Sequence, residues 1–253
     1  MGSRRTIGSL LASYPRIRPP LSPSQQAHYA DHYRRNRSSA GGLPAITATL
    51  ESWMHRAVSG KQQPGARILE LGAGNLNHVP YEPRAAAYDV VEPFRLLWED
   101  SPYRRSVRTI YDDIEQVEAE SQYDRIISIA VLEHLLDLPR VVARCGLLLS
   151  PGGRFQAGIP TEGGLLWGLA WRLTTGIAYR LQRGEAYGRI MRHEHVNDAA
   201  EIQMIVGHFF RKVAVRRFPL PFFHLSFYTY LEAVSPDLER CAALCNSRKQ
   251  GGS

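Results

Sequence analysis

The sequence of 253 residues has only three cysteines and no long apolar run at its N-terminus. The three thiols of Cys145, Cys241 and Cys245 cannot all pair, and they lack the spacing of a zinc site, so we expect a reducing compartment and no metal. Cys241 and Cys245 instead have the spacing of two small residues in a C-terminal helix. The apolar residues 8–11 are soon followed by Ser13 and Pro15, which is unlike a secretory signal. We therefore expect a cytoplasmic protein.

Charge is distributed unevenly along the chain. The formal net charge is +7. Residues 1–60 carry 8 basic and 2 acidic side chains, residues 61–162 carry 11 and 15, and residues 163–253 carry 12 and 7. Basic clusters can bind phosphates without reading a nucleotide sequence, but solvated arginines give the same pattern. The charge alone therefore does not predict a nucleic-acid partner.

Five apolar segments alternate with helical patterns in the centre of the chain. They are residues 67–71, 87–91, 107–111, 124–129 and 153–159. This alternation predicts an α/β fold with a doubly wound, mostly parallel sheet. Residues 212–218 and 224–234 are joined by a short connection, which predicts an antiparallel pair at the sheet edge. We expect seven strands in total, including an antiparallel edge strand.

Helical patterns surround these strands. Residues 138–149 are amphipathic, and Asp198 with Glu201 forms a capping box before a helix to about residue 210. Before the core, residues 46–58 predict one helix, and residues 24–37 predict another with Tyr29 and Tyr33 one turn apart.

Three regions are expected from these patterns. Residues 1–60 form an N-terminal arm and helical lid, and the proline-rich start of this region, residues 1–24, is expected to be extended or mobile. Residues 61–236 form the core domain. Residues 237–253 form a C-terminal tail.

A glycine turn follows the first predicted strand. Gly72, Ala73 and Gly74 would let a ligand approach the backbone closely. Glu92 follows the second strand 18 residues after Gly74, close to the spacing of about 20 at which an acid binds ribose hydroxyls. The turn lacks the third glycine of a dinucleotide site, and the carboxylate of Glu70 could reach a cationic cofactor. This pattern disfavours a nicotinamide cofactor.

Five ordered motifs resemble those of class I, Rossmann-like methyltransferases of the small-molecule type, which depend on S-adenosylmethionine. The motifs are residues 68–75, 91–93, 111–114, 123–134 and 149–155, and the resemblance covers about residues 61–235. It implies S-adenosylmethionine as the methyl donor and S-adenosylhomocysteine as the product. The implied acceptor is an oxygen or nitrogen of a small molecule.

The resemblance also assigns cofactor-binding residues. In that family the glycine turn lies beside the methionine part of the cofactor, and the acid after the second strand binds the ribose. The acid after the third strand approaches the adenine amine, and the segment after the fourth strand packs on the cofactor. Besides Glu70, the implied residues are Gly72, Ala73, Gly74, Glu92, Pro93, Asp113 with Asp112 as its alternative, Ile114, Ile129, Ala130, Val131, Leu132 and His134.

Histidines are the candidates for proton transfer. His134 belongs to a Leu-Glu-His segment common in the small-molecule members, where it acts as a base or orients a loop. His193 and His195 lie in a stretch that often borders the acceptor pocket in that family, and an imidazole pKa of about 6.5 suits a proton acceptor. In an extended segment both would face the same side. We therefore take His193 and His195 as catalytic candidates for substrate orientation or proton removal. The alternatives are a hydrogen-bonded loop and metal binding by the pair, for which the sequence shows no third ligand.

Residues 163–192 predict a helical insertion on the acceptor side. With Tyr29 and Tyr33, we expect Trp167, Arg172 and Arg192 to cover the acceptor. Five arginines against one glutamate in this segment predict an acidic group on the acceptor or an anionic surface. The segment is too polar to span a bilayer. Peripheral contact with a membrane or a lipid-linked acceptor is the alternative to a lid that packs on the sheet.

Motifs of other methyltransferase subclasses are missing. No Asp-Pro-Pro-Tyr-like motif follows the fourth strand, where Ile129 and Ala130 stand, and no cysteine follows a proline. These absences disfavour methylation of DNA bases. An RNA-directed methyltransferase and a noncatalytic cofactor-binding protein on the same fold remain as alternatives.

Overall fold

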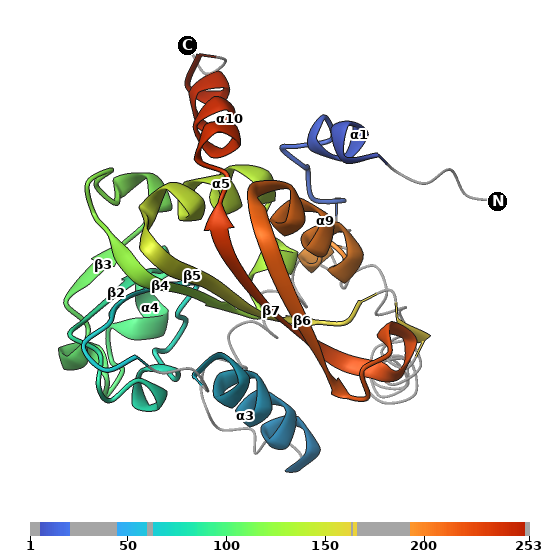
Figure 1. Cartoon of the computed structure of the whole chain (residues 1–253). Helices are drawn as coiled ribbons and strands as arrows, with labels where there is room; N and C mark the ends of the chain where they lie inside the picture. The colour runs from blue at the N-terminus through green and yellow to red at the C-terminus, as the bar shows by residue number, and fades with distance from the viewer. Residues whose placement is uncertain (1–5, 21–44, 60–62, 163, 166–192, 251–253) are drawn as a thin grey trace.

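A seven-stranded sheet with helices on both faces forms the centre of the protein (Figure 1). The computed structural model describes residues 6–20, 45–59, 63–162, 164–165 and 193–250. The strands are β1 (Arg67–Leu71), β2 (Ala87–Val91), β3 (Thr109–Tyr111), β4 (Tyr123–Ile129), β5 (Leu149–Pro160), β6 (Phe210–Pro219) and β7 (Ser226–Pro236). Their order across the sheet is β3-β2-β1-β4-β5-β7-β6.

The sheet is mostly parallel, which confirms the predicted α/β fold. Strands β1 to β5 pair in parallel. Strand β7 runs antiparallel to both of its neighbours, β5 and β6, so the predicted antiparallel pair occupies this edge of the sheet and β7 lies one position inside it. Strand order reverses between β1 and β4, and ligands of such sheets bind beside the carboxyl ends of the strands at this point.

The helices are placed largely as their patterns predict. They are α1 (Ile7–Leu11), α3 (Ala45–Ser59), α4 (Arg95–Trp98), α5 (Leu138–Leu148), α9 (Ala199–Phe209) and α10 (Leu238–Gln250), and short 3-10 turns include η1 (Val79–Tyr81), η3 (Ile114–Gln116) and η4 (Leu132–His134). The predicted capping box begins α9: the Asp198 carboxylate accepts from the Glu201 N–H at 2.8 Å, and the Glu201 carboxylate accepts from the Asp198 N–H at 3.2 Å.

Both faces of the sheet are buried. Leu69 of β1 and Ile126 of β4 belong to the cluster covered by α5 and α9, whereas their neighbours Ile68 and Ile127 belong to the cluster on the α3 side. Side chains of a strand alternate between faces, so two buried faces require consecutive apolar residues. This burial explains why the central strands appear in the sequence as continuous apolar runs.

Residues at both ends of the chain contribute to this core. The segment predicted to be extended contains α1, whose N-cap Thr6 accepts from the Ser9 N–H, and Leu10 and Tyr14 are buried in the core. The prolines of this segment all follow α1, so none of them interrupts its hydrogen bonds. In the C-terminal region, Cys241 of α10 is buried, and a Cβ at Gly146 of α5 would lie 2.8 Å from its Sγ.

Several predicted features lie outside the described residues. These are the helix over residues 24–37 with Tyr29 and Tyr33, and nearly all of the insertion, including Trp167, Arg172 and Arg192. Within the described ranges, no helix is long and apolar enough to cross a membrane.

Candidate functional site

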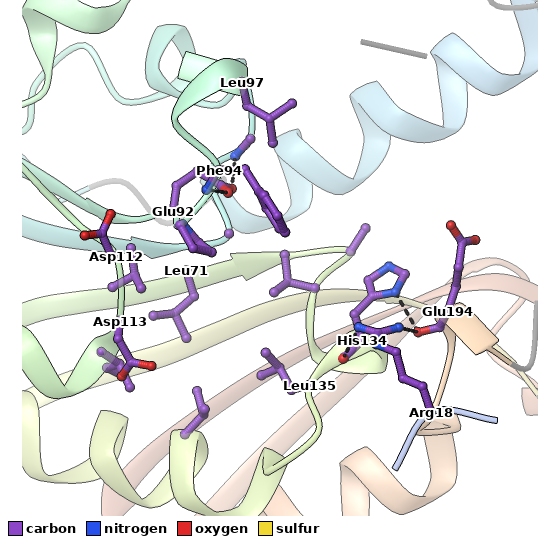
Figure 2. Close-up of a pocket in the computed structure, with 18 residues that line it drawn as sticks. Arg18, Leu71, Glu92, Phe94, Leu97, Asp112, Asp113, His134, Leu135 and Glu194 are labelled. Carbon is purple, nitrogen blue, oxygen red and sulfur yellow. Dashed lines mark hydrogen bonds between the residues drawn. The ribbon is translucent and has the colours of Figure 1, made fainter. Parts of the chain in front are cut away.

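A cavity of about 570 Å³, the first cavity, lies at the carboxyl ends of β1 to β4 (Figure 2). Its volume is typical of a site for a small molecule. Ten of the predicted cofactor residues line it: Gly72, Gly74, Glu92, Pro93, Asp112, Asp113, Ile114, Ala130, Val131 and His134. The topology therefore brings together motifs that are far apart in the sequence.

The glycine turn after β1 forms one wall of the first cavity. Gly72 and Gly74 have φ values of +66° and +52°, a region in which glycine has no steric penalty. A Cβ at Gly72 would collide with the Val131 side chain, whereas a Cβ at Gly74 would meet nothing within 4 Å. Gly72 thus allows the turn to pack against the segment after β4, and Gly74 leaves open space beside the backbone.

Glu92 connects the ends of two neighbouring strands. Its buried carboxylate accepts from the Gly74 N–H at 2.8 Å through Oε2 and from the Phe94 N–H at 3.0 Å through Oε1. Each carboxylate oxygen has a second acceptor position. Glu92 can therefore hold the glycine turn and still accept hydrogen bonds from a ligand in the first cavity.

Two acids follow β3 on the same side of the first cavity (Figure 2). Asp113 is the N-cap of η3, and its Oδ1 accepts from the Glu115 N–H at 2.8 Å. The backbone N–H of Asp112 donates to the Gln116 side chain. Among the described residues, the Asp112 carboxylate has no hydrogen-bond partner, so both acids have oxygens available to a ligand.

Four predicted cofactor residues do not line the first cavity. Glu70 alternates in β1 with Leu71, which does line it, so the Glu70 carboxylate is on the other face and accepts from the Tyr88 hydroxyl at 2.7 Å. Ala73 and Ile129 pack in the α3-side cluster, and Leu132 packs in the opposite one. Glu70 therefore does not reach the first cavity, contrary to the expectation that it contacts a cofactor there.

Burial makes Glu70 a group whose protonation affects stability. Burial raises the pKa of Glu70 to about 8, whereas an unfolded chain releases this proton near pH 4.3. Between these two values the folded state binds the extra proton, so stability falls as pH rises. When the pH rises from 5.5 to 8, we expect the free energy of unfolding of wild type to fall by more than about 1 kcal/mol relative to that of Glu70→Gln. Urea unfolding at the two pH values measures this difference. A difference that is the same at both pH values would contradict this prediction.

His134 is fixed as a neutral ring beside the first cavity. Burial lowers the pKa of His134 to about 4, and the positive charges of His195 and Arg18 act in the same direction. Its Nδ1–H donates to the Glu194 carbonyl at 2.9 Å, which leaves Nε2 as a hydrogen-bond acceptor. This ring can orient a ligand, but its low pKa makes it a weak base.

His195 forms a dyad with Glu162, which follows β5. The Nδ1–H of His195 donates to the Glu162 carboxylate. Burial lowers the pKa of His195, but this hydrogen bond and the charges of Glu162, Glu133 and Glu194 outweigh burial and raise it. The His195 ring meets the His134 ring edge to face, with centroids 4.6 Å apart. The only hint of Glu162 in the sequence is its position just after a predicted strand.

The structure separates His193 from this dyad. Residues 193–194 are helical rather than extended, so the predicted arrangement of His193 and His195 on one side does not hold. The His193 ring instead donates to the Pro19 carbonyl at 2.7 Å. Within the described residues, the two catalytic candidates thus differ in their ring contacts: His195 donates to a carboxylate, and His193 donates to a backbone carbonyl.

The dyad borders a second cavity, of about 720 Å³. It is lined by Ser9 and Ser13 near α1, by Arg16, and by Glu162 and His195, among others. His134 lines the first cavity and His195 lines the second, so the contact between their rings lies between the two cavities.

Arg18 is a residue of the first cavity that the sequence did not indicate. Its guanidinium donates to the carbonyls of His193 at 2.8 Å, Glu194 at 3.1 Å and His134 at 3.1 Å.

No group of three or more metal-ligating side chains occurs in the part of the chain that the structure describes.

Comparisons with known proteins agree with this geometry. A family model described as a methyltransferase domain matches residues 33–197. The fold is similar to the N-methyltransferase NodS from Bradyrhizobium japonicum in complex with S-adenosylhomocysteine, with a TM-score of 0.52 and 14% identity over 75% of this chain and 87% of NodS. No curated protein matches the sequence.

Two further solved structures have similar folds. The magnesium protoporphyrin IX methyltransferase from Synechocystis has a TM-score of 0.51 and 16% identity over 82% of this chain and 94% of its own. A possible histamine N-methyltransferase from Thermotoga maritima has a TM-score of 0.53 and 13% identity over 81% of this chain and 96% of its own. Because the family model covers more than half of the sequence and the sheet has the expected topology, the chain belongs to the methyltransferase domain family and has the class I fold of S-adenosylmethionine-dependent enzymes.

Proposed function

We propose that S-adenosylmethionine binds in the first cavity and that its methyl group is transferred to an oxygen or nitrogen of a small-molecule acceptor. The observation that carries this proposal is the convergence of ten predicted cofactor residues on one cavity at the strand-order reversal. The residues also fit the cofactor in charge. Glu92, Asp112 and Asp113 place three carboxylates at the cavity against the guanidinium of Arg18, and the cofactor carries a sulfonium and an ammonium against one carboxylate.

Each part of the cofactor has a proposed partner in the chain. Glu92 accepts hydrogen bonds from the ribose hydroxyls, and Asp113, or alternatively Asp112, accepts from the adenine amine. The turn at Gly72 and Gly74 lies beside the methionine part. The open space at Gly74 supports this placement, because any side chain there would occupy the volume next to the backbone.

The bound cofactor supplies an electrophilic methyl carbon, and the chain supplies orientation and proton removal. Holding two reactants in line can contribute about 7–11 kcal/mol of the acceleration. We propose that the second cavity admits the acceptor and that neutral His195 removes its proton. Glu162 orients the imidazole for this role by accepting its Nδ1–H. An acceptor hydroxyl needs such a base more than an amine does.

Calorimetry with S-adenosylhomocysteine tests the binding site. We expect wild type to bind, and we expect Gly74→Trp to bind at least about 100-fold more weakly, because the indole would fill the space next to the turn. Gly152→Trp is the matched control, since Gly152 also has a positive φ, +80°, and open space around its Cβ position, but it lies at the start of β5 and does not line the first cavity. Equal affinity in Gly74→Trp and wild type would contradict the placement.

A screen with isotopically labelled methyl donor tests the reaction and the acceptor class. We expect label to pass to a small molecule in a metabolite mixture. Label transferred to RNA instead would favour the RNA-directed alternative. Binding of the cofactor without any transfer would favour a noncatalytic protein and contradict the proposed activity.

A further inference from the structure

Two arginines lie two residues apart after α1 but have different kinds of partner. Arg16 donates two hydrogen bonds to the Glu201 carboxylate, at 2.8 and 2.9 Å, so its charge is compensated within the protein. Arg18 donates only to backbone carbonyls, and none of the described carboxylates pairs with it. Carbonyls satisfy the N–H groups without cancelling the charge. Arg18 therefore retains an uncompensated positive charge.

This charge is located in the first cavity, away from the main group of acids. Arg18 lies beside His134 and Leu135, whereas Asp112 and Asp113 lie on the opposite side (Figure 2). Glu194 also lines the cavity, but its carboxylate points away from Arg18 and only its carbonyl accepts from the guanidinium (Figure 2). The first cavity thus has an acidic side and a basic side.

The guanidinium also has hydrogen-bonding capacity left. Arginine has five N–H donors in a planar fork, and the three recorded hydrogen bonds of Arg18 leave donors unused. A carboxylate matches this fork, because two parallel N–H···O bonds can form.

We propose that Arg18 binds a carboxylate in the first cavity. This inference rests on the proposed function, which offers two sources of that group: the amino-acid end of S-adenosylmethionine, or an acidic acceptor. Recognition of either ligand would then depend on the N-terminal segment, which lies outside the predicted core domain at residues 61–236.

Calorimetry on the full chain separates the two sources. Two ligands are compared: S-adenosylhomocysteine, and 5′-methylthioadenosine, which keeps the adenosine and the sulfur but lacks the carboxylate. If the cofactor supplies the group, Arg18→Gln should weaken S-adenosylhomocysteine about 10- to 100-fold and leave 5′-methylthioadenosine within about twofold, since hydrogen bonds to charged groups have this range of strength. Arg18→Lys should restore part of the affinity because it keeps the charge but loses the fork. Arg240→Gln, which removes a positive charge from α10, is the matched control.

If both ligands bind Arg18→Gln as well as wild type, the acceptor is the remaining source. A labelled-donor assay on a panel of carboxylic acids and phosphate esters then compares Arg18→Gln with wild type. For the acids that wild type methylates, the KM of Arg18→Gln should be about 10- to 100-fold higher.

Other results would overturn the inference. If Arg18→Gln weakens the affinity for both ligands equally, the role of Arg18 is structural: it only holds residues 193–194 against His134 through their backbone carbonyls. Both sources would be excluded if Arg18→Gln kept its affinity for both ligands and also methylated every acidic acceptor with the wild-type KM. A wild-type protein that binds neither ligand would overturn the proposed function and this inference with it. Normal wild-type binding, with an Arg18→Gln variant that matches wild type both in ligand affinity and in its use of every acceptor, would overturn this inference alone.

Discussion

Replacing Glu92 with alanine should weaken binding of S-adenosylhomocysteine by at least about 100-fold. The variant loses the proposed acceptor of two ribose hydrogen bonds, each to a charged group and each contributing about 1.5–3 kcal/mol. It also releases the Gly74 N–H, which donates to Glu92 at 2.8 Å, so the glycine turn loses part of its support. Isothermal titration calorimetry measures the effect directly.

A neighbouring acid provides the control for this variant. Glu99 pairs with Arg95 on α4 and does not line the first cavity, so Glu99→Ala should bind within about twofold of wild type. Thermal melting of both variants establishes that each is folded. A folded Glu92→Ala with wild-type affinity would exclude the proposed ribose contact.

His195→Phe should reduce the rate of methyl transfer to a hydroxyl acceptor by about 10²- to 10⁴-fold, the usual contribution of a general base. The phenyl ring keeps the shape that packs on His134, so the affinity for S-adenosylhomocysteine should stay within about threefold. His208→Phe, a substitution on α9, is the matched control. Loss of cofactor affinity equal to the loss of rate would instead indicate a structural role for His195.

The pH profile separates catalysis by the dyad from simple packing. Neutral His195 is the proposed base, so the rate rises with pH through its pKa, which Glu162 helps to raise. Glu162→Gln removes the negative charge and lowers this pKa. The acidic limb of the kcat profile should therefore move to lower pH, and a limb that does not move would contradict the role of Glu162.

Local patterns were sufficient to predict the sheet and the wall of the first cavity. The predicted bounds of β1 and β2 agree with the structure, because short apolar runs end there at Gly72 and Glu92. Since parallel strands place their carboxyl ends at one edge, residues that follow four strands had to meet. The prediction for Glu70 is wrong because side chains of β1 alternate between the two faces of the sheet, so Glu70 meets Tyr88 on the face opposite Leu71.

Long-range contacts explain what the sequence could not predict. Tyr14 donates to Asn197 across 183 positions at 2.6 Å, and Arg16 reaches Glu201 across 185 positions. These pairs position the segment with His195 beside His134, yet neither end has a local motif. A proline-rich segment with two arginines has the same pattern whether it is solvated or packed. Arg18, Glu162 and the second cavity therefore emerged only from the fold.

A crystal structure of the protein with S-adenosylhomocysteine is the most direct test of the central claim. We expect the nucleoside in the first cavity, with the ribose hydroxyls within hydrogen-bond distance of the Glu92 carboxylate and the adenine amine beside Asp113 or Asp112. A ligand bound elsewhere on the protein, or crystals that hold none at saturating concentration, would contradict the account.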